Sequence, residues 1–178
     1  MTRYTDVILT SGGVDSSFLC FQAAQDKTPA LALFVDYGQP AARVEERCAR
    51  RVAKTAELDF QFVKVAGLPL GDMSDWRSGP SVVPARNLWL IALAAAFGQT
   101  VWIGAVPEDW SDYADCRPAF LWELDDAMRT AYDAEVRWAY EDRAARVAYL
   151  EEHGHSRLVW SCYGPGPEPC GACASCTQ

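Results

Sequence analysis

The string that most constrains this chain is Thr10-Ser11-Gly12-Gly13-Val14-Asp15-Ser16-Ser17, which follows a short apolar run. Residues 6–10 (DVILT) form a short apolar run that contains β-branched residues, which is typical of a buried strand, and residues 16–25 favour a helix. Two glycines between a strand and a helix let the backbone approach an anion closely. The N–H groups of the helix N-terminus add a partial positive charge. The string therefore predicts a phosphate-binding turn, although a plain turn with serine as the helix cap has the same composition.

The rest of the chain alternates between strand-like and helix-like segments. We expect strands at 30–35, 60–65 and 100–105, and helices at 43–58, 87–97 and 119–128, with a further helical stretch to about residue 152. The helix at 43–58 has one apolar face, whereas the one at 87–97 is apolar all round and should be buried. Residues 67–84 form a long loop, a kind that is usually functional. The pattern predicts one α/β domain over 1–178, a parallel sheet with helices on both faces.

Net charge and hydropathy argue against two classes of protein, those that bind nucleic acid and those that span a membrane. The 16 basic and 24 acidic residues leave a net charge of −8, which argues against gripping a polynucleotide through general positive charge. The longest apolar run, 88–97, is half of the roughly 20 residues that span a bilayer, and the N-terminus lacks a signal-peptide pattern. We expect a cytoplasmic protein that binds neither nucleic acid nor membrane.

Four of the seven cysteines crowd the end of the chain: Cys162, Cys170, Cys173 and Cys176. Four thiolates complete a closed tetrahedral zinc site, and the two-residue spacings suit one knuckle. Residues 160–178 are therefore predicted to be a structural zinc-binding tail, whose metal contributes on the order of 10 kcal/mol to folding. An iron–sulfur cluster or cysteines without a ligand are the alternatives.

The turn at 11–17 lacks the lysine of a Walker loop and the spacing of GxGxxG, so neither of those sites applies. It is instead similar to the SGGxDS signature of the PP-loop ATP pyrophosphatases, the adenine-nucleotide alpha-hydrolase-like enzymes that cleave ATP to AMP and pyrophosphate. This resemblance implies ATP and magnesium as ligands of the turn.

Three further strings are DYGQ at 36–39, VPARNL at 83–88 and DWSDYADCRP at 109–118. Taken singly, each is equally typical of a turn, a helix start or a surface loop. In this order, and followed by WSCY at 160–163 and CGxCxxC at 170–176, they resemble the 7-cyano-7-deazaguanine synthases. The resemblance extends from about residue 7 to residue 176.

The resemblance implies an ATP-dependent ligase. Its members adenylate the carboxylate of 7-carboxy-7-deazaguanine, let ammonia displace AMP to give an amide, and dehydrate the amide to the nitrile with a second ATP. Matching positions imply Asp15, Arg86 and Asn87 as catalytic residues. They further imply nucleotide contacts at Ser11, Gly12, Gly13, Asp15, Ser16 and Ser17, base contacts at Tyr37, Asp112, Asp115 and Arg117, and zinc ligands at Cys162, Cys170, Cys173 and Cys176. We also expect a homodimer.

Two departures from the family pattern keep alternatives open. Pro40 and Ala41 follow YGQ where the family has a basic residue and a histidine, and Arg143 falls near the position of a family lysine. A divergent paralogue would join the activated carboxylate to another amine, on a peptide or a partner protein. A nucleotide-binding domain without turnover is the third reading.

Overall fold

The computed structural model describes residues 4–68, 82–138 and 140–177. Its centre is a five-stranded, fully parallel sheet with strand order β3-β2-β1-β4-β5. The strands are β1 (Tyr4–Leu9), β2 (Ala30–Asp36), β3 (Asp59–Lys64), β4 (Gly98–Ile103) and β5 (Glu135–Trp138). The helices are α1 (Val14–Asp26), α2 (Ala42–Thr55), α3 (Arg86–Ala94), α4 (Pro118–Tyr132), α5 (Arg143–Glu152) and α6 (Ala174–Thr177), with short 3-10 turns η1 (Pro107–Asp109), η2 (Ala114–Cys116) and η3 (Ser156–Leu158).

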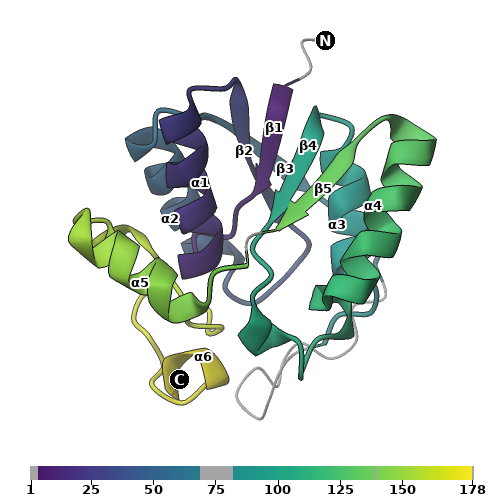
Figure 1. Ribbon diagram of the computed structural model, residues 1–178. Helices are drawn as coiled ribbons and strands as arrows, with labels where there is room; N and C mark the ends of the chain where they lie inside the picture. Colours follow the sequence, from purple (N-terminus) through teal and green to yellow (C-terminus); the bar gives the residue numbers. More distant parts are fainter. Residues whose placement is uncertain (1–3, 69–81, 139, 178) are drawn as a thin grey trace.

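Helices cover both faces of the sheet, as the sequence predicted (Figure 1). Alternate strand residues point to opposite faces, so Val7 of β1 packs with α3 and α4, whereas its neighbour Ile8 packs with α1 and α2. Leu150 brings α5 into the second of these layers. Both faces are buried, which explains the nearly continuous apolar composition of the inner strands.

The predicted phosphate-binding turn at residues 10–17 follows the central strand β1. At this strand the order in which successive strands are added changes from one side of the sheet to the other. β1 is central, with Val7 beside Leu31 of β2 and beside Val101 of β4. β2 and β3 extend to one side and β4 and β5 to the other, so a crevice opens above the carboxyl ends of β1 and β4. Ligands of open parallel sheets bind at such a switch point.

The expected strands and helices up to residue 128 are confirmed, with ends that differ by a few residues. The further helical stretch expected to about residue 152 is present as α5, which ends at Glu152, but the edge strand β5 at Glu135–Trp138 was not expected. α5 then begins after Asp142, whose carboxylate accepts a hydrogen bond from Ala145 N at 2.8 Å. This cap satisfies one of the free N–H groups of the first turn.

Two further expectations concern the middle of the chain. Most of the predicted loop at 67–84 lies outside the described residues. The helix expected to be buried is α3, and it is buried only in part: Ile91 and Ala94 are inaccessible, but Leu88 is exposed. Across the described ranges, no helix combines the length and the apolar character needed to cross a bilayer.

Candidate active site

The turn after β1 adopts a conformation that only glycine accepts at its centre. Gly12 has φ +74°, and a Cβ there would lie 2.7 Å from Ala49 N and 2.8 Å from Cys48 Cβ. The turn therefore packs directly on α2, and a side chain at Gly12 would push the two apart. On the other side, a Cβ at Gly104, just after β4, would come within 3.0 Å of Asp15 Cβ. The turn is clamped between α2 and the end of β4.

Hydroxyl groups close the turn on itself. Ser16 Oγ accepts a hydrogen bond from Ser11 N at 3.1 Å and lies 3.3 Å from Ser11 Oγ, and Gly13 N donates to Ser11 Oγ at 3.3 Å. Gly13 is the N-cap of α1. The N-terminus of α1 thus meets a small polar concavity, the arrangement that favours a bound phosphate.

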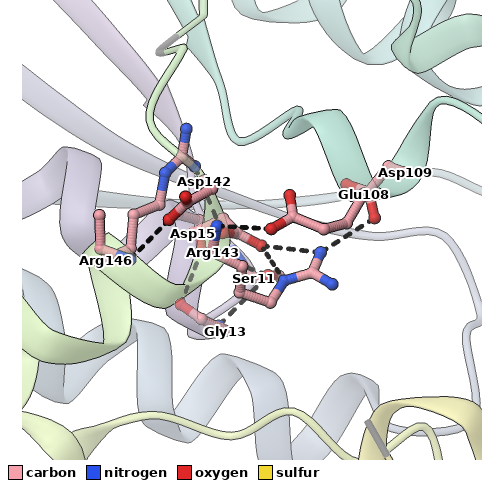
Figure 2. Close-up of polar contacts among 10 residues, drawn as sticks. Ser11, Gly13, Asp15, Glu108, Asp109, Asp142, Arg143 and Arg146 are labelled. Carbon is pink, nitrogen blue, oxygen red and sulfur yellow. Dashed lines mark hydrogen bonds and ion pairs between the residues drawn. The ribbon is translucent and has the colours of Figure 1, made fainter.

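Asp15, in the first turn of α1, is held by two arginines of α5 (Figure 2). Arg146 Nη1 donates to Asp15 Oδ1 at 3.3 Å, while Arg143 donates to Oδ2 from Nε at 3.3 Å and from Nη2 at 3.2 Å. Arg143 Nη2 also donates to Asp109 Oδ1 at 2.9 Å. Both carboxylate oxygens of Asp15 are therefore engaged.

Arg146 is the unusual member of this group, because its side chain is completely buried. Its guanidinium also lies 5.4 Å from the ring centre of Phe18. Burial lowers the pKa of Arg146, which Asp15 opposes. Burial raises the pKa of Asp15, and the two arginines offset only part of that rise. Asp15 and Arg146 therefore depend on each other for charge compensation.

Three adjoining cavities surround the turn, of about 240, 250 and 590 Å³. Ser11, Asp15, Glu45 and Tyr163 line all three. The 250 Å³ cavity reaches between the carboxyl ends of β1, β2 and β4. The 590 Å³ cavity extends along α5, and the 240 Å³ cavity lies between them and the start of α3. Together they offer room for a nucleotide and a second small molecule.

The 240 Å³ cavity combines aromatic rings with charges. Tyr37, Tyr113 and Tyr163 line it together with Arg86 and Glu45. The Arg86 guanidinium lies 5.6 Å from the ring centre of Tyr113. Burial raises the pKa of Tyr37 and of Glu45. Rings and opposite charges in one cavity suit a flat, polar heterocycle.

The four tail cysteines converge as the sequence predicted. Their sulfur atoms all lie within 4.8 Å of one another, so they could hold a metal ion. Backbone N–H groups point at the sulfurs: those of Gly164 and Cys170 donate to Cys162 Sγ at 3.3 and 3.2 Å. Hydrogen bonds from the backbone of Ala172 and Cys173 lower the pKa of Cys170 to about 6. Four converging thiols of this kind fit a tetrahedral zinc site.

The tail is attached to the nucleotide-type turn. Trp160 N donates to Gly12 O at 2.8 Å, and Trp160 Nε1 donates to Cys162 O at 2.7 Å. The same residue therefore connects the backbone of the turn to the first cysteine of the cluster. Tyr163, one residue further, lines the cavities.

A family model described as "Queuosine biosynthesis protein QueC" matches residues 5–178. The chain belongs to this family. It is 32% identical to the 7-cyano-7-deazaguanine synthases of Methanoculleus marisnigri and Campylobacter concisus, in both cases over 96% of this chain and 89% of the relative. Among solved structures it is similar to an NMN synthetase from Francisella tularensis, with TM-score 0.58 and 15% identity over 94% of this chain and 70% of that one. This structural likeness shows that the two chains share a fold.

The structure of this QueC-family chain brings together most of the site residues predicted from sequence. Those that line the cavities are Ser11, Gly13, Asp15, Ser16, Tyr37, Arg86, Asn87 and Asp112. Gly12 shapes the turn from beneath, and Ser17 is completely buried in α1. Neither lines a cavity.

Asn87 and Asp115 contact each other. Asn87 N donates to Asp115 Oδ2 at 3.0 Å, and Asn87 Nδ2 donates to Asp115 O at 3.0 Å and to Cys116 Sγ at 3.3 Å. This arrangement fastens the start of α3 to η2 and so fixes Arg86. Arg117 is exposed, donates to Trp110 O at 2.7 Å and does not line a cavity.

Sequence reasoning missed Glu45, Tyr163 and Arg146. Glu45 lies in the first turn of α2, where an acidic residue is ordinary because it complements the helix dipole. Tyr163 was recognised only as part of the WSCY string. Arg146 sits in a helix rich in charge, and the sequence offers no signal that this one arginine is buried.

Proposed function

We propose that this chain is an ATP-dependent carbon–nitrogen ligase that converts 7-carboxy-7-deazaguanine and ammonia into 7-cyano-7-deazaguanine. The observation that carries the proposal is the set of adjoining cavities, in which the phosphate-type turn after β1 and the cation Arg86 share walls. A carboxylate held near Arg86 would lie beside a triphosphate held at the turn. Membership of the QueC family supports the same chemistry.

The proposed chemistry balances without free water. A carboxylate oxygen attacks the α-phosphorus of ATP, forming the acyl adenylate and releasing pyrophosphate. Ammonia adds to the acyl carbon, AMP leaves with that oxygen, and the ammonium proton is lost. The amide oxygen then attacks the α-phosphorus of a second ATP and releases a second pyrophosphate. The O-adenylated imidate loses AMP and both N–H protons, which leaves the nitrile. Both carboxylate oxygens depart in AMP, because AMP is a far better leaving group than hydroxide.

We assign separate tasks to the two ends of the cavities. Ser11, Gly13 and Ser16, with the N-terminus of α1, bind the phosphates. Arg86 binds the carboxylate as a planar fork of donors, and its rigid attachment through Asn87 keeps the reacting oxygen in place. Positioning of this kind lowers the barrier by removing orientational freedom.

We propose that Mg²⁺ accompanies the triphosphate and that zinc occupies the cysteine cluster. Carboxylate oxygens are the donors that Mg²⁺ prefers, and Asp15, Asp109 and Asp112 line the 590 Å³ cavity beside the turn. These residues would hold the magnesium with its phosphates. Four cysteines fill the coordination sphere of zinc, so its role is structural.

We also propose a homodimer that uses α3. Leu88 is 43% exposed at the start of the apolar part of α3, and a second copy of the chain would cover it. Light scattering of the protein and of a Leu88→Ser variant checks this point. A monomeric wild-type protein would contradict it.

The decisive experiment for the activity incubates the protein with ATP, ammonium and 7-carboxy-7-deazaguanine and weighs the product. We expect the nitrile, with AMP and pyrophosphate as the nucleotide products. ADP would contradict the PP-loop chemistry. Product formation only with a peptide or another amine would favour the divergent-paralogue alternative, and failure to consume ATP with any acceptor would favour a binding domain without turnover.

A further inference from the structure

Glu45 lines the cavities, but neither the sequence nor the proposed function gives it a role. It extends from the first turn of α2 and lines all three cavities. Of the other acidic residues that line these cavities, Asp15 and Asp109 are paired with Arg143, and Glu108, Asp112 and Glu151 line only the 590 Å³ cavity along α5. Glu45 has no such cationic partner within 4 Å in the described part of the chain. Its carboxylate is thus available to a ligand.

Gln39 fixes the carboxylate of Glu45 in place. Gln39 Nε2 donates to Glu45 Oε2 at 2.9 Å and to Val35 O at 3.3 Å, and Gln39 Oε1 accepts from Tyr37 N at 3.0 Å. Every polar atom of the Gln39 side chain is used in this clamp. Glu45 Oε1 makes no hydrogen bond to any described residue, and Oε2 retains a lone pair.

Arg86 faces the same 240 Å³ cavity as Glu45. The two side chains influence each other's charge, since Arg86 lowers the pKa of Glu45 against the rise that burial causes. Even so, no ion pair within 4 Å joins them among the residues described here. Tyr37 and Asp115 stabilise the charge of Arg86, whose pKa is raised despite its burial. Within the ranges that the structure describes, the carboxylate of Glu45 is hydrogen-bonded only by the Gln39 amide, so a ligand that donates hydrogen bonds would offset the cost of burying it.

The proposed substrate carries the matching groups at opposite ends. The pyrimidine edge of a deazaguanine presents two adjacent donors, the ring N–H and the exocyclic amino group, and the five-membered ring carries the carboxylate. A carboxylate accepts a pair of parallel N–H groups with both oxygens, and an arginine donates to a carboxylate in the same manner. Tyr37 and Tyr113 line the cavity beside them and offer faces for the flat ring.

We propose that Glu45 is the specificity-determining residue of this site, accepting both N–H groups of the guanine edge while Arg86 takes the carboxylate at the other end. This inference rests on the proposed function and adds to it the residue that reads the base. Gln39 lines the same cavity but acts as a positioning residue, because both polar atoms of its side chain are already engaged in orienting Glu45.

The test compares the binding of two bases in the presence of a non-hydrolysable ATP analogue. One is 7-carboxy-7-deazaguanine and the other is its 2-oxo counterpart, in which an acceptor replaces the amino donor. Wild type should prefer the guanine-type base. In Glu45→Gln, the amide oxygen still accepts from the ring N–H but the amide nitrogen now donates. We expect the affinity for the guanine-type base to fall about 10- to 100-fold and the preference to shift toward the 2-oxo base.

Glu46→Gln is the matched control. Glu46 is the next residue of α2, pairs with Arg50 at 2.8 Å and lines none of the cavities. This variant should bind both bases as wild type does. Glu45→Asp keeps the charge but withdraws it by one methylene, so it should bind the guanine-type base at least fivefold more weakly without changing the preference.

The outcomes separate the two proposals. If wild type binds neither base, the proposed function fails. If wild type binds the guanine-type base but Glu45→Gln and Glu45→Asp bind it equally well, Glu45 does not read the base. Weaker binding of the ATP analogue alone would assign Glu45 to the nucleotide and overturn the inference. If Glu45→Gln does not fold, the Glu45→Asp result decides.

Discussion

The two walls of the site differ in whether their charged side chains form ion pairs with one another. On the wall formed by α1, α5 and η1, ion pairs of 2.9 to 3.3 Å join Asp15, Asp109, Arg143 and Arg146. On the wall formed by α2 and α3, Glu45 and Arg86 share a cavity without an ion pair between them among the described residues. The charged side chains of the first wall are paired with one another, so a ligand that binds them must replace some of these ion pairs. The carboxylate and the guanidinium of the second wall are not paired with each other and can both bind a ligand.

The largest effect should come from removing the metal of the tail, because both walls depend on it. Trp160 holds Gly12 O from the tail, and Tyr163 lines every cavity. Stripping the metal removes on the order of 10 kcal/mol of binding free energy that supports this fold. We expect a strong chelator to abolish nucleotide binding and to lower the thermal midpoint sharply.

The same experiment identifies the metal. Metal analysis of the untreated protein should give one zinc per chain, and Cys173→Ser should destabilise it far more than Cys48→Ser, which alters a thiol on α2 away from the cluster. Iron in place of zinc, or equal effects of the two substitutions, would refute the assignment.

The next effect tests the compensated wall. Asp15→Asn should abolish activity and also destabilise the fold, because it removes the carboxylate that forms an ion pair with the buried Arg146. Removing one partner of such a pair costs about 3 kcal/mol, which corresponds to a fall of roughly 6–12 °C in thermal midpoint for a chain of this size.

A double-mutant cycle with Arg146→Met is the control for this effect. Asp15→Asn combined with Arg146→Met should recover much of the midpoint while remaining inactive, because the buried charge is gone but the carboxylate is still missing. Additive losses of stability would show that the two residues are not coupled.

The third effect tests the open wall. The family resemblance implied Arg86 as a catalytic residue and Arg117 as a base contact, and of these two cations only Arg86 lines the cavity. Arg86→Met should lower kcat/KM about 100- to 1000-fold, as expected when a desolvated charge loses its partner. Arg117→Met should change it less than about threefold. A larger loss from Arg117→Met would move the carboxylate to the loop at 109–118.

The smallest effect should come from replacing Arg143 on the first wall. This residue falls near the position where the family pattern has a lysine. Arg143→Lys retains a cation that can reach one of its two carboxylates, but a point charge cannot reproduce the fork that bridges Asp15 and Asp109. We expect steady-state kinetics to show less than a tenfold fall in kcat, and Arg143→Met to show a larger one. Equal effects of the two would mean that charge at this position is unimportant.

Much of the fold was predictable because its elements are locally encoded. The buried strands are apolar runs between turn residues, and α2 has a clear apolar face with Val44, Cys48 and Val52. β5 was missed because it has only four residues and exists through pairing with β4, a non-local interaction that no local pattern reports. A short segment beside two helices is easily taken as a continuation of them.

The site was predictable where spacing itself carries chemistry. The glycine turn and the four cysteines are such cases, and both lie where expected. Glu45 and Arg146 were not predictable, because their importance comes from where the helices place them. A charged residue on a helix is ordinarily solvated, and only packing against α1 turns Arg146 into a buried partner of Asp15.

The hydrogen bond from Trp160 N to Gly12 O has a consequence for the synthesis of the protein. The turn belongs to residues 10–17, but the backbone that braces it comes from residue 160, after all five strands of the sheet in sequence order. During synthesis, β1, β2 and β4 are therefore available for pairing before their brace exists, and the turn at Gly12 is braced only after residue 160 has emerged.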